Sequence, residues 1–371
     1  MLKSLLRPFH ALLGRGEYAV TIPVMDGAFQ PNQALEAATR RASAPSVDNL
    51  VLSSESILCS SNTNLLRLGL NDSAPTTLAS FDTAISCLSL SPNGAIAVGL
   101  EASGLIIQGG PHNGKVFPNE PGTDLGCLTA CLWDGEDALL LCNGSSVHGV
   151  THWKHDLMSL GRSGSVIRLS LATGSITRLS SNLAFPYGIA RSADGQLLVS
   201  ESWLHRVVKI DSQAPTATPQ QVLSGLPGYP ARIIPASIGG YWLTLFAARN
   251  QLIEFVLRER EYCRRMMETV EPEYWIAPAY TTGRSFKEPL QGDGVKQMGV
   301  LKPWAPPRSY GLIVLCDAEM KPLHSWHSRA DGSVHAITSV VDTGSMILAS
   351  ARGPGQIVEL PIPTQDSREW E

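Results

Sequence analysis

Charged and aromatic residues are scarce in this sequence of 371 residues. Charged residues make up 17% of the chain, aromatic residues make up 6%, and the formal net charge is only −4. No stripe of lysine and arginine is present, so we expect no nucleic-acid partner. The sequence therefore predicts a chain whose chemistry depends on a few individual polar side chains.

Cysteine is infrequent and forms no metal-binding pattern. Cys127 and Cys131 are four residues apart, but no second pair and no nearby pair of histidines accompanies them, so zinc is not expected. Cys59, Cys87 and Cys142 lie in or beside apolar runs and are predicted to be small buried side chains. An odd total of seven cysteines without a signal peptide is typical of a reducing compartment, so the expected localisation is cytoplasmic.

The first residues also lack a long apolar run. Met1–Leu13 contains Lys3, Arg7 and His10 between short apolar runs. This segment falls short of the roughly 18 apolar residues that span a bilayer. The segment could contact a membrane surface, but we favour the alternative that it is an N-terminal arm packed against the rest of the protein.

Glycine and proline are abundant, and they separate short apolar strands. The chain has 33 glycines, 25 prolines and 43% apolar residues. Pairs of strands joined by Asp-Gly, Asn-Gly or Gly-Gly recur along the chain, a pattern that indicates antiparallel hairpins. A hairpin that recurs about every 45 residues is typical of a β-propeller blade. The six copies span Asp48–Ser60, Cys87–Gly99, Ala130–Ser145, the turn at Asp194, the turn at Gly239, and Ala336–Ser350.

Six copies predict an all-β, six-bladed β-propeller. We expect an N-terminal arm over residues 1–45, the propeller over residues 46–362 and a C-terminal tail over residues 363–371. Residues 251–308 do not follow the repeat and read as a helical, proline-rich insertion between blades five and six. Long insertions of this kind are lids or links, and a lid over one end of the channel is favoured.

Several motifs resemble one known family. Phe185–Ala190 with Ser200–Trp203 resembles the core of strictosidine-synthase-like proteins. Gly225–Pro230 with Gly239–Trp242 is similar to their adipocyte plasma-membrane-associated branch. Met25–Asn32 and His155–Met158 also match that branch, and the resemblance covers about residues 24–362.

The resemblance implies a site at one mouth of the channel. The wider superfamily includes gluconolactonases, regucalcin and paraoxonases, and in its hydrolytic members a calcium ion polarises a lactone or ester carbonyl. Equivalent places in this chain are Asp48, Asn143, Tyr187, Arg232 and His335. In the calcium-binding relatives the position of Tyr187 is an asparagine, and that of Ala231-Arg232 is Asp-Asn. Asp48 and Asn143 keep oxygen-bearing side chains and are the alternative calcium ligands. Two such ligands make a poor calcium site, so no cofactor is expected.

The resemblance also suggests a proton-transfer group. Strictosidine synthase is metal-free and uses a glutamate in its last blade, and the nearest position here is His335. A histidine can transfer protons near neutral pH. Tyr187 and Asn143 would be hydrogen-bond donors, and Arg232 would orient an anionic substrate. Glu201 is a candidate base or a link between blades, and His148 is a candidate ligand contact or a rim residue.

The expected function is therefore that of an enzyme acting on a small molecule at the channel mouth. Hydrolysis of a lactone or ester is the leading hypothesis. A metal-free condensing or lyase-type enzyme and a non-catalytic small-molecule-binding propeller remain as alternatives, since one fold hosts many functions.

Overall fold

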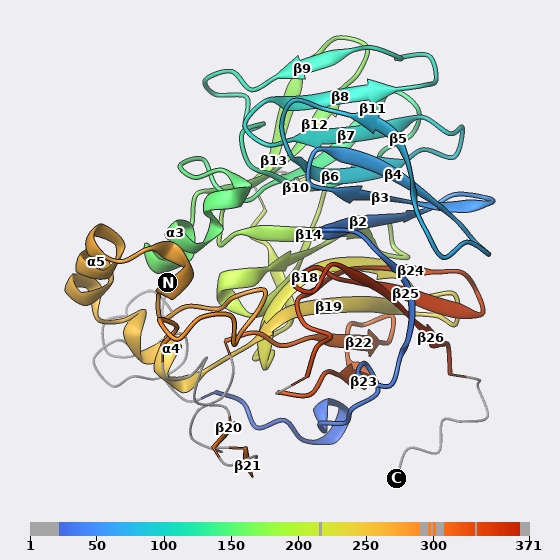
Figure 1. Cartoon of the computed structure of the whole chain (residues 1–371). Coiled ribbons are helices and arrows are strands. Elements are labelled where there is room, and N and C mark those ends of the chain that lie inside the picture. Colours follow the sequence, from blue (N-terminus) through green and yellow to red (C-terminus); the bar gives the residue numbers. More distant parts are fainter. Residues whose placement is uncertain are drawn as a thin grey trace.

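A ring of six four-stranded antiparallel sheets makes up the protein in its computed structural model (Figure 1). The structure describes residues 22–214, 217–289, 296–297, 300–301, 308–330 and 332–363. The predicted six-bladed β-propeller is confirmed. From the innermost strand outward, the blades are β2 (Val47–Leu52), β3 (Ser56–Ser61), β4 (Asn64–Gly69) and β5 (Thr76–Ser80) in blade one; β6 (Ile85–Leu90), β7 (Ile96–Leu100), β8 (Gly104–Gln108) and β9 (Val116–Pro118) in blade two; β10 (Leu128–Trp133), β11 (Ala138–Asn143), β12 (Gly164–Ser170) and β13 (Ile176–Leu183) in blade three; β14 (Pro186–Arg191), β15 (Leu197–Glu201), β16 (Arg206–Ile210) and β17 (Gln220–Leu223) in blade four; β18 (Gly228–Pro235), β19 (Tyr241–Ala248), β22 (Leu312–Cys316) and β23 (Pro322–His327) in blade five; and β24 (Ile337–Asp342), β25 (Met346–Ala351), β26 (Gln356–Pro361) and β1 (Thr39–Ser43) in blade six.

The ring closes through strands from both ends of the chain. The innermost strands contact one another in the order β2, β6, β10, β14, β18 and β24, and β24 contacts β2 again. β1 pairs with β26, so that Thr39 lies opposite Glu359 and Ser43 opposite Gln356. The last part of the expected N-terminal arm therefore supplies the outermost strand of blade six. β1 also covers an edge of β26 that would otherwise be open for pairing.

Apolar contacts between neighbouring blades form the core. The second strands β3 and β11 are buried along their whole length, whereas the outer strand β5 is largely exposed. A strand that lies between two sheets buries both faces, which is why its sequence is a continuous run of small and apolar residues. The buried cluster of Ala42, Val47, Leu50, Val341 and Leu348 joins blade six to blade one in this way.

The hairpin turns explain the abundance of glycine. Gly240, between β18 and β19, has a φ of +77°, and an added Cβ would lie 2.0 Å from the carbonyl oxygen of Cys316. Only glycine accommodates both the left-handed conformation and this close approach. The turn thereby fixes the pairing of the first two strands of blade five.

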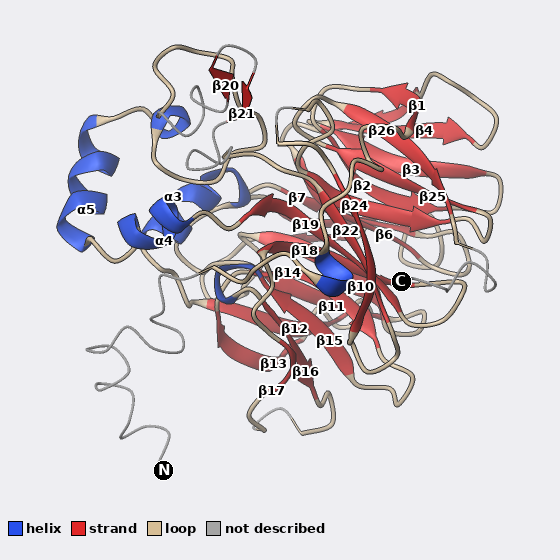
Figure 2. Ribbon diagram, turned by 90° about the horizontal axis from the view of Figure 1, so that it is seen from below, coloured by secondary structure: helices blue, strands red, loops and turns tan. Residues whose placement is uncertain are grey.

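The two sides of the ring differ in their connections. Where the innermost strands begin, long loops carry α3 (Trp153–Met158), α4 (Gln251–Val256) and α5 (Arg260–Thr269). Figures 1 and 2 both show these helices grouped on one side of the strands. We call this the helical side. The opposite side, where tight turns join the first and second strands of each blade, is the hairpin side.

One boundary differs from the prediction. The insertion lies within blade five, between β19 and β22, and not between blades five and six. The repeat count recognised only the hairpin of β18 and β19, whereas β22 returns after the insertion and pairs with β19. The described part of the insertion also contains the short pair β20 (Lys296–Gln297) and β21 (Val300–Leu301).

The terminal predictions fall mostly outside the described residues. Residues 1–21 of the expected arm and residues 364–371 of the expected tail are not described. Among the helices that are described, none is long and apolar enough to cross a membrane. The seven cysteines are described as free thiols, and Cys59, Cys87 and Cys142 are buried as expected.

Ring closure by β1 can be tested with two neighbouring substitutions. Ala42 is buried between blades six and one, whereas Ser43 is exposed on the same strand. Ala42→Asp should lower the free energy of unfolding by about 3–5 kcal/mol, because it places an unpaired charge in the interface. Ser43→Asp should change it by less than about 0.5 kcal/mol. Urea denaturation of both variants measures the difference, and equal effects would contradict closure by β1.

Candidate functional site

The innermost strand of every blade contains a break in its pairing register, near the helical side. The breaks lie at Asn49 and Leu50, Ser86, Thr129, Tyr187, Ala231 and Arg232, and Thr338. Residues at such a β-bulge have no ladder partner, so their backbone groups can turn toward another acceptor or donor. Six equivalent bulges therefore place unpaired polar groups around the channel. We call Asn49, Ser86, Thr129, Tyr187, Arg232 and Thr338 the bulge ring.

The Arg232 side chain, from blade five, fills this ring. Its side chain is 12% exposed. The Tyr187 ring of blade four lies 5.3 Å from the guanidinium carbon. Nη1 donates to Asp48 Oδ1 at 2.8 Å and to the Thr338 carbonyl at 3.2 Å, while Nη2 donates to the carbonyls of Ser86 at 3.3 Å and Thr129 at 3.2 Å and to Asn49 Oδ1.

These contacts connect Arg232 to all five other blades. A guanidinium is a planar fork of five N–H donors, which suits a ring of carbonyl and carboxylate oxygens. The carbonyls of Ser86, Thr129 and Thr338 belong to bulged residues, so the guanidinium supplies the donors that the sheet does not. The arginine thus stabilises a backbone irregularity that is common to the whole ring.

Asp48 lies between two guanidinium groups. Its Oδ1 accepts from Arg232 and from Thr338 Oγ1 at 2.7 Å, and its Oδ2 accepts from Arg352 Nη1 at 3.2 Å. Burial works to raise the pKa of this carboxyl, but Arg232 and Arg352 outweigh it and hold the pKa below its ordinary value. Asp48 is therefore an ionised hydrogen-bond acceptor and a weak base.

Arg352 links Asp48 to Tyr280 of the insertion, which lies on the helical side. It follows β25, and its guanidinium carbon lies 4.7 Å from the centre of the Tyr280 ring. Arg352 Nη1 also donates to the Tyr280 hydroxyl at 3.4 Å. Burial raises the pKa of Tyr280 well above its ordinary value, so the phenol keeps its proton at neutral pH. Two arginines face one carboxylate, which leaves this site with one net positive charge.

Aromatic side chains surround this charged centre. The Tyr280 ring comes from the insertion and lies 5.4 Å from Trp153 of α3 and 5.9 Å from Phe246 of β19. Tyr187 packs edge-on against Phe185 and Phe246. The insertion and the blade-three loop therefore pack together over the helical side, in the position that the lid hypothesis requires.

Asn143 and His335 make different contacts from those expected. Asn143 lies at the end of β11, where its Oδ1 accepts from the Cys127 amide at 2.9 Å and its Nδ2 donates to the Ser145 carbonyl at 3.1 Å. His335 Nε2 lies 2.9 Å from the Arg329 carbonyl and Nδ1 lies 2.7 Å from Ser309 Oγ. A carbonyl can only accept, so Nε2 carries the proton and Nδ1 of the neutral ring accepts from Ser309. Both side chains are therefore engaged by the protein itself.

Glu201 and His148 contact partners outside the bulge ring. Glu201 is fully buried, where Oε1 accepts from the Ala184 amide at 2.8 Å and Oε2 pairs with Arg206 Nε at 2.5 Å. These contacts agree with the interpretation of Glu201 as a link between blades, because Ala184 lies in the connection between blades three and four. His148 lies in the blade-three loop with its ring centre 5.8 Å from that of His155. The structure thus brings together Tyr187, Arg232 and Asp48, and it adds two residues that the sequence analysis missed, Arg352 and Tyr280.

The residues present do not fit a calcium ion. Calcium takes six to eight oxygen ligands. Both carboxylate oxygens of Asp48 accept from guanidinium groups, and Asn143 Oδ1 accepts from a backbone amide. A guanidinium occupies the centre of the bulge ring, where its charge repels a cation. Within the described part of the chain, no group of three or more histidine, cysteine, aspartate or glutamate side chains could hold a metal ion.

Comparison with known proteins agrees with the motifs. Residues 132–213, from blade three to blade four, match the strictosidine synthase family model. Strictosidine synthase-like 9 of Arabidopsis thaliana is 28% identical over 31% of this chain and 32% of its own length, and strictosidine synthase-like 2 of the same plant is 30% identical over the same shares. The matched region therefore spans about a third of these curated relatives.

These matches support the predicted resemblance: the chain is similar to strictosidine synthase-like proteins from blade three to blade four, and its fold is a six-bladed propeller.

Solved structures extend the fold similarity to nearly the whole chain. A calcium-binding regucalcin from Agrobacterium tumefaciens has a TM-score of 0.53 and 13% identity over 88% of this chain and 94% of its own. A putative gluconolactonase has a TM-score of 0.53 and 10% identity over 94% and 96%. A luciferin-regenerating enzyme has a TM-score of 0.53 and 13% identity over 89% and 94%. At these identities the likeness shows the propeller fold alone.

The lowered pKa of Asp48 predicts a pH dependence of stability. Because the folded-state pKa is depressed, ionised Asp48 stabilises the protein fully above the ordinary carboxyl pKa of 3.8, and this contribution is lost as the pH falls through the folded-state pKa. Asp48→Asn should lower the free energy of unfolding by about 3–5 kcal/mol at pH 7, because it leaves two buried arginines without their partner. The difference from the unsubstituted protein should shrink as the pH falls below 3.8.

Chemical denaturation at pH 7 and in acid measures this difference. The control is Asp82→Asn, whose side chain is exposed and should contribute less than about 0.5 kcal/mol. A difference for Asp48→Asn that stays constant with pH would contradict the assignment.

Proposed function

We propose that the helical side of the channel binds a small molecule that carries a carboxylate or carbonyl group, and that the chain hydrolyses a lactone or ester there without a metal. The observation that carries this proposal is the net positive charge of the Asp48, Arg232 and Arg352 cluster. The Arg352 side chain is 23% exposed, so part of it is accessible to a ligand. An anionic or polarised oxygen would complete the charge balance.

Arg352 and Tyr280 would stabilise negative charge on the carbonyl oxygen. Donors aimed at the place where charge develops supply much of the rate enhancement in acyl transfer. The raised pKa of Tyr280 keeps its proton available at neutral pH. Asp48 holds Arg352 in position, and the guanidinium of Arg232 holds Asp48.

Hydrolysis also needs a group that accepts a proton from water. His335 remains the sequence-based candidate for that role. Its Nδ1 is hydrogen-bonded to Ser309, so the Ser309 hydroxyl must turn away before the ring can take a proton at that nitrogen. If His335 is the base, His335→Ala lowers turnover about a hundredfold while the fold is kept.

A non-catalytic binding propeller is the second candidate. The contacts of His335 and Glu201 favour it, because each side chain hydrogen-bonds to neighbouring protein groups through both of its polar atoms. This candidate predicts saturable binding of small anions without turnover. It uses the same Arg352 and Tyr280 donors as the hydrolase.

The hydrolase proposal predicts a specific effect of Arg352→Gln. Removing one charged donor should lower kcat/KM for anionic aryl esters and lactones about a hundredfold. Arg178→Gln is the matched control, since Arg178 forms an ion pair with Asp124 on the outside of blade three and is 53% exposed. The assay is turnover of an ester and lactone panel, with folding of each variant checked by circular dichroism.

The same panel measured in excess chelator tests the metal-independent part. Turnover should be unchanged by the chelator. Loss of turnover on chelation would refute a metal-free reaction, and binding without any turnover would favour the second candidate. An Arg352→Gln variant with unchanged kcat/KM would remove the charged cluster from the reaction.

A further inference from the structure

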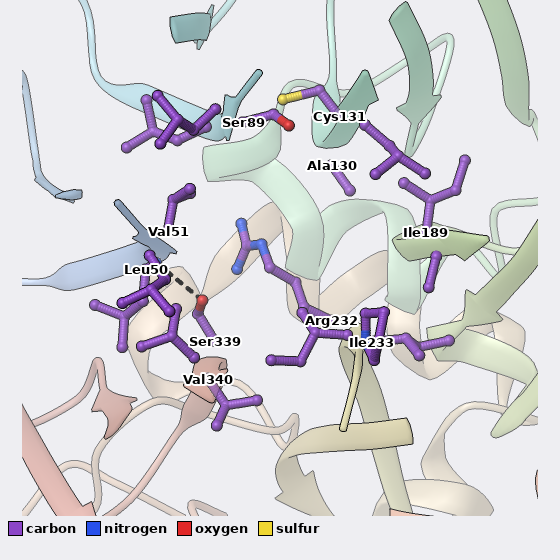
Figure 3. Close-up of a pocket in the computed structure, with 18 of the residues that line it drawn as sticks. Leu50, Val51, Ser89, Ala130, Cys131, Ile189, Arg232, Ile233, Ser339 and Val340 are labelled. Atoms are coloured by element: carbon purple, nitrogen blue, oxygen red, sulfur yellow. Dashed lines mark hydrogen bonds between the residues drawn. The ribbon is translucent and has the colours of Figure 1, made fainter. Parts of the chain in front are cut away.

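A cavity lies on the hairpin side, beyond the bulge ring. It has a volume of about 350 Å³ and is lined by residues of all six blades. Figure 3 shows Leu50 and Val51, Ile189, and Val340 around it, with the Arg232 side chain extending into the space between them. The cavity is therefore a separate space from the helical-side cluster, and Arg232 forms its inner end.

The walls of this cavity are mainly leucine, isoleucine, valine and alanine. Its volume lies within the range of about 300–1,000 Å³ that is typical of small-molecule sites. This is roughly ten times the share of one liquid water molecule, and ordered waters need two to four polar partners. Ser339 lines the cavity, and its hydroxyl accepts from the Leu50 amide at 2.9 Å, which leaves its single O–H donor for a water or ligand. Water held by such walls is readily displaced by an apolar group.

The charged residues at the outer rim are already paired. Arg191 donates to Asp134 at 2.5 Å and to the Gly195 carbonyl at 3.0 Å. Asp342 accepts from Trp242 Nε1 and from the Ser237 amide, both at 2.8 Å. Asp342 keeps its negative charge, because these two donors are neutral, whereas Arg191 is paired with Asp134 and is no rival to Arg232 for an anionic head.

The inner end is polar and positive. Within the contacts of the described residues, Arg232 donates through its two terminal nitrogens, and Nε–H is left without a partner. Behind it, Arg352 adds a second positive charge against the single carboxylate of Asp48. An apolar cavity that ends at a guanidinium donor matches a molecule with an apolar tail and one anionic head.

We propose that the hairpin-side cavity binds a small monocarboxylate with an apolar tail, with its head toward Arg232. The site is distinct from the proposed reaction site, because its lining residues other than Arg232 lie beyond the bulge ring. The tail would pack against the branched side chains from the six innermost strands. The head would accept a hydrogen bond from Arg232 Nε.

Calorimetric titration with octanoate tests the proposal, with octylammonium and acetate as comparison ligands. Octanoate should bind saturably, while octylammonium lacks the acceptor and acetate lacks the tail, so both should bind at least tenfold more weakly. Val51→Phe and Ile189→Phe each fill part of the cavity and should weaken octanoate binding at least tenfold. Val116→Phe is the matched control, because Val116 is exposed on β9.

Arg352→Gln distinguishes this site from the helical-side site. Octanoate binding should weaken less in Arg352→Gln than in the cavity-filling variants, because Arg352 adds charge behind Arg232 but does not line the cavity. Binding that survives both cavity-filling variants but is lost in Arg352→Gln would place the anion on the helical side and overturn the proposal. Absence of octanoate binding to the unsubstituted protein would also overturn it, whatever the result of the ester assays.

Discussion

The hydrogen bonds of Arg232 are the interaction on which the centre of this propeller depends. Each innermost strand is bulged near the same end, and each bulge exposes polar groups to the channel. Buried carbonyl groups without a donor are costly. One guanidinium supplies donors to the carbonyls of Ser86, Thr129 and Thr338. The Arg232 side chain of blade five therefore contacts the five other sheets at their centre, although the sheets share no strand.

This arrangement also determines the chemistry of the channel. A guanidinium at the axis replaces the oxygen-rich environment that a calcium ion requires. Asp48 is then held as the counter-ion of two arginines, and its lowered pKa makes it a poor base. The helical side offers hydrogen-bond donors and positive charge, whereas the hairpin side offers apolar walls. The two sides of Arg232 thus differ in the ligands they suit.

Much of the fold could be predicted from the sequence, because each blade contains an inner hairpin with turn residues at its tip. The position of the insertion could not, because β22 is separated from its partner β19 by residues 249–311 and nothing in a local pattern marks that pairing. The meeting of Tyr187 and Arg232 followed from their equivalent places in the repeat. Arg352 and Tyr280 were missed because one follows a second strand and the other belongs to the insertion, so neither occupies the position that was compared. The contacts of Asn143 and His335 depend on which backbone groups lie nearby, and that information is not local in sequence.

Hydrogen–deuterium exchange of Arg232→Met is the most direct test of the central role of this arginine, with Arg178→Met as the surface control. If one guanidinium joins the blades, amide exchange should become faster in peptides from the innermost strands of all six blades, including Val47–Leu52, Ile85–Leu90 and Ile337–Asp342. Arg178→Met should leave the same peptides unchanged. Faster exchange confined to β18 and β19 of blade five would contradict the account, because it would show that Arg232 stabilises only the sheet that carries it.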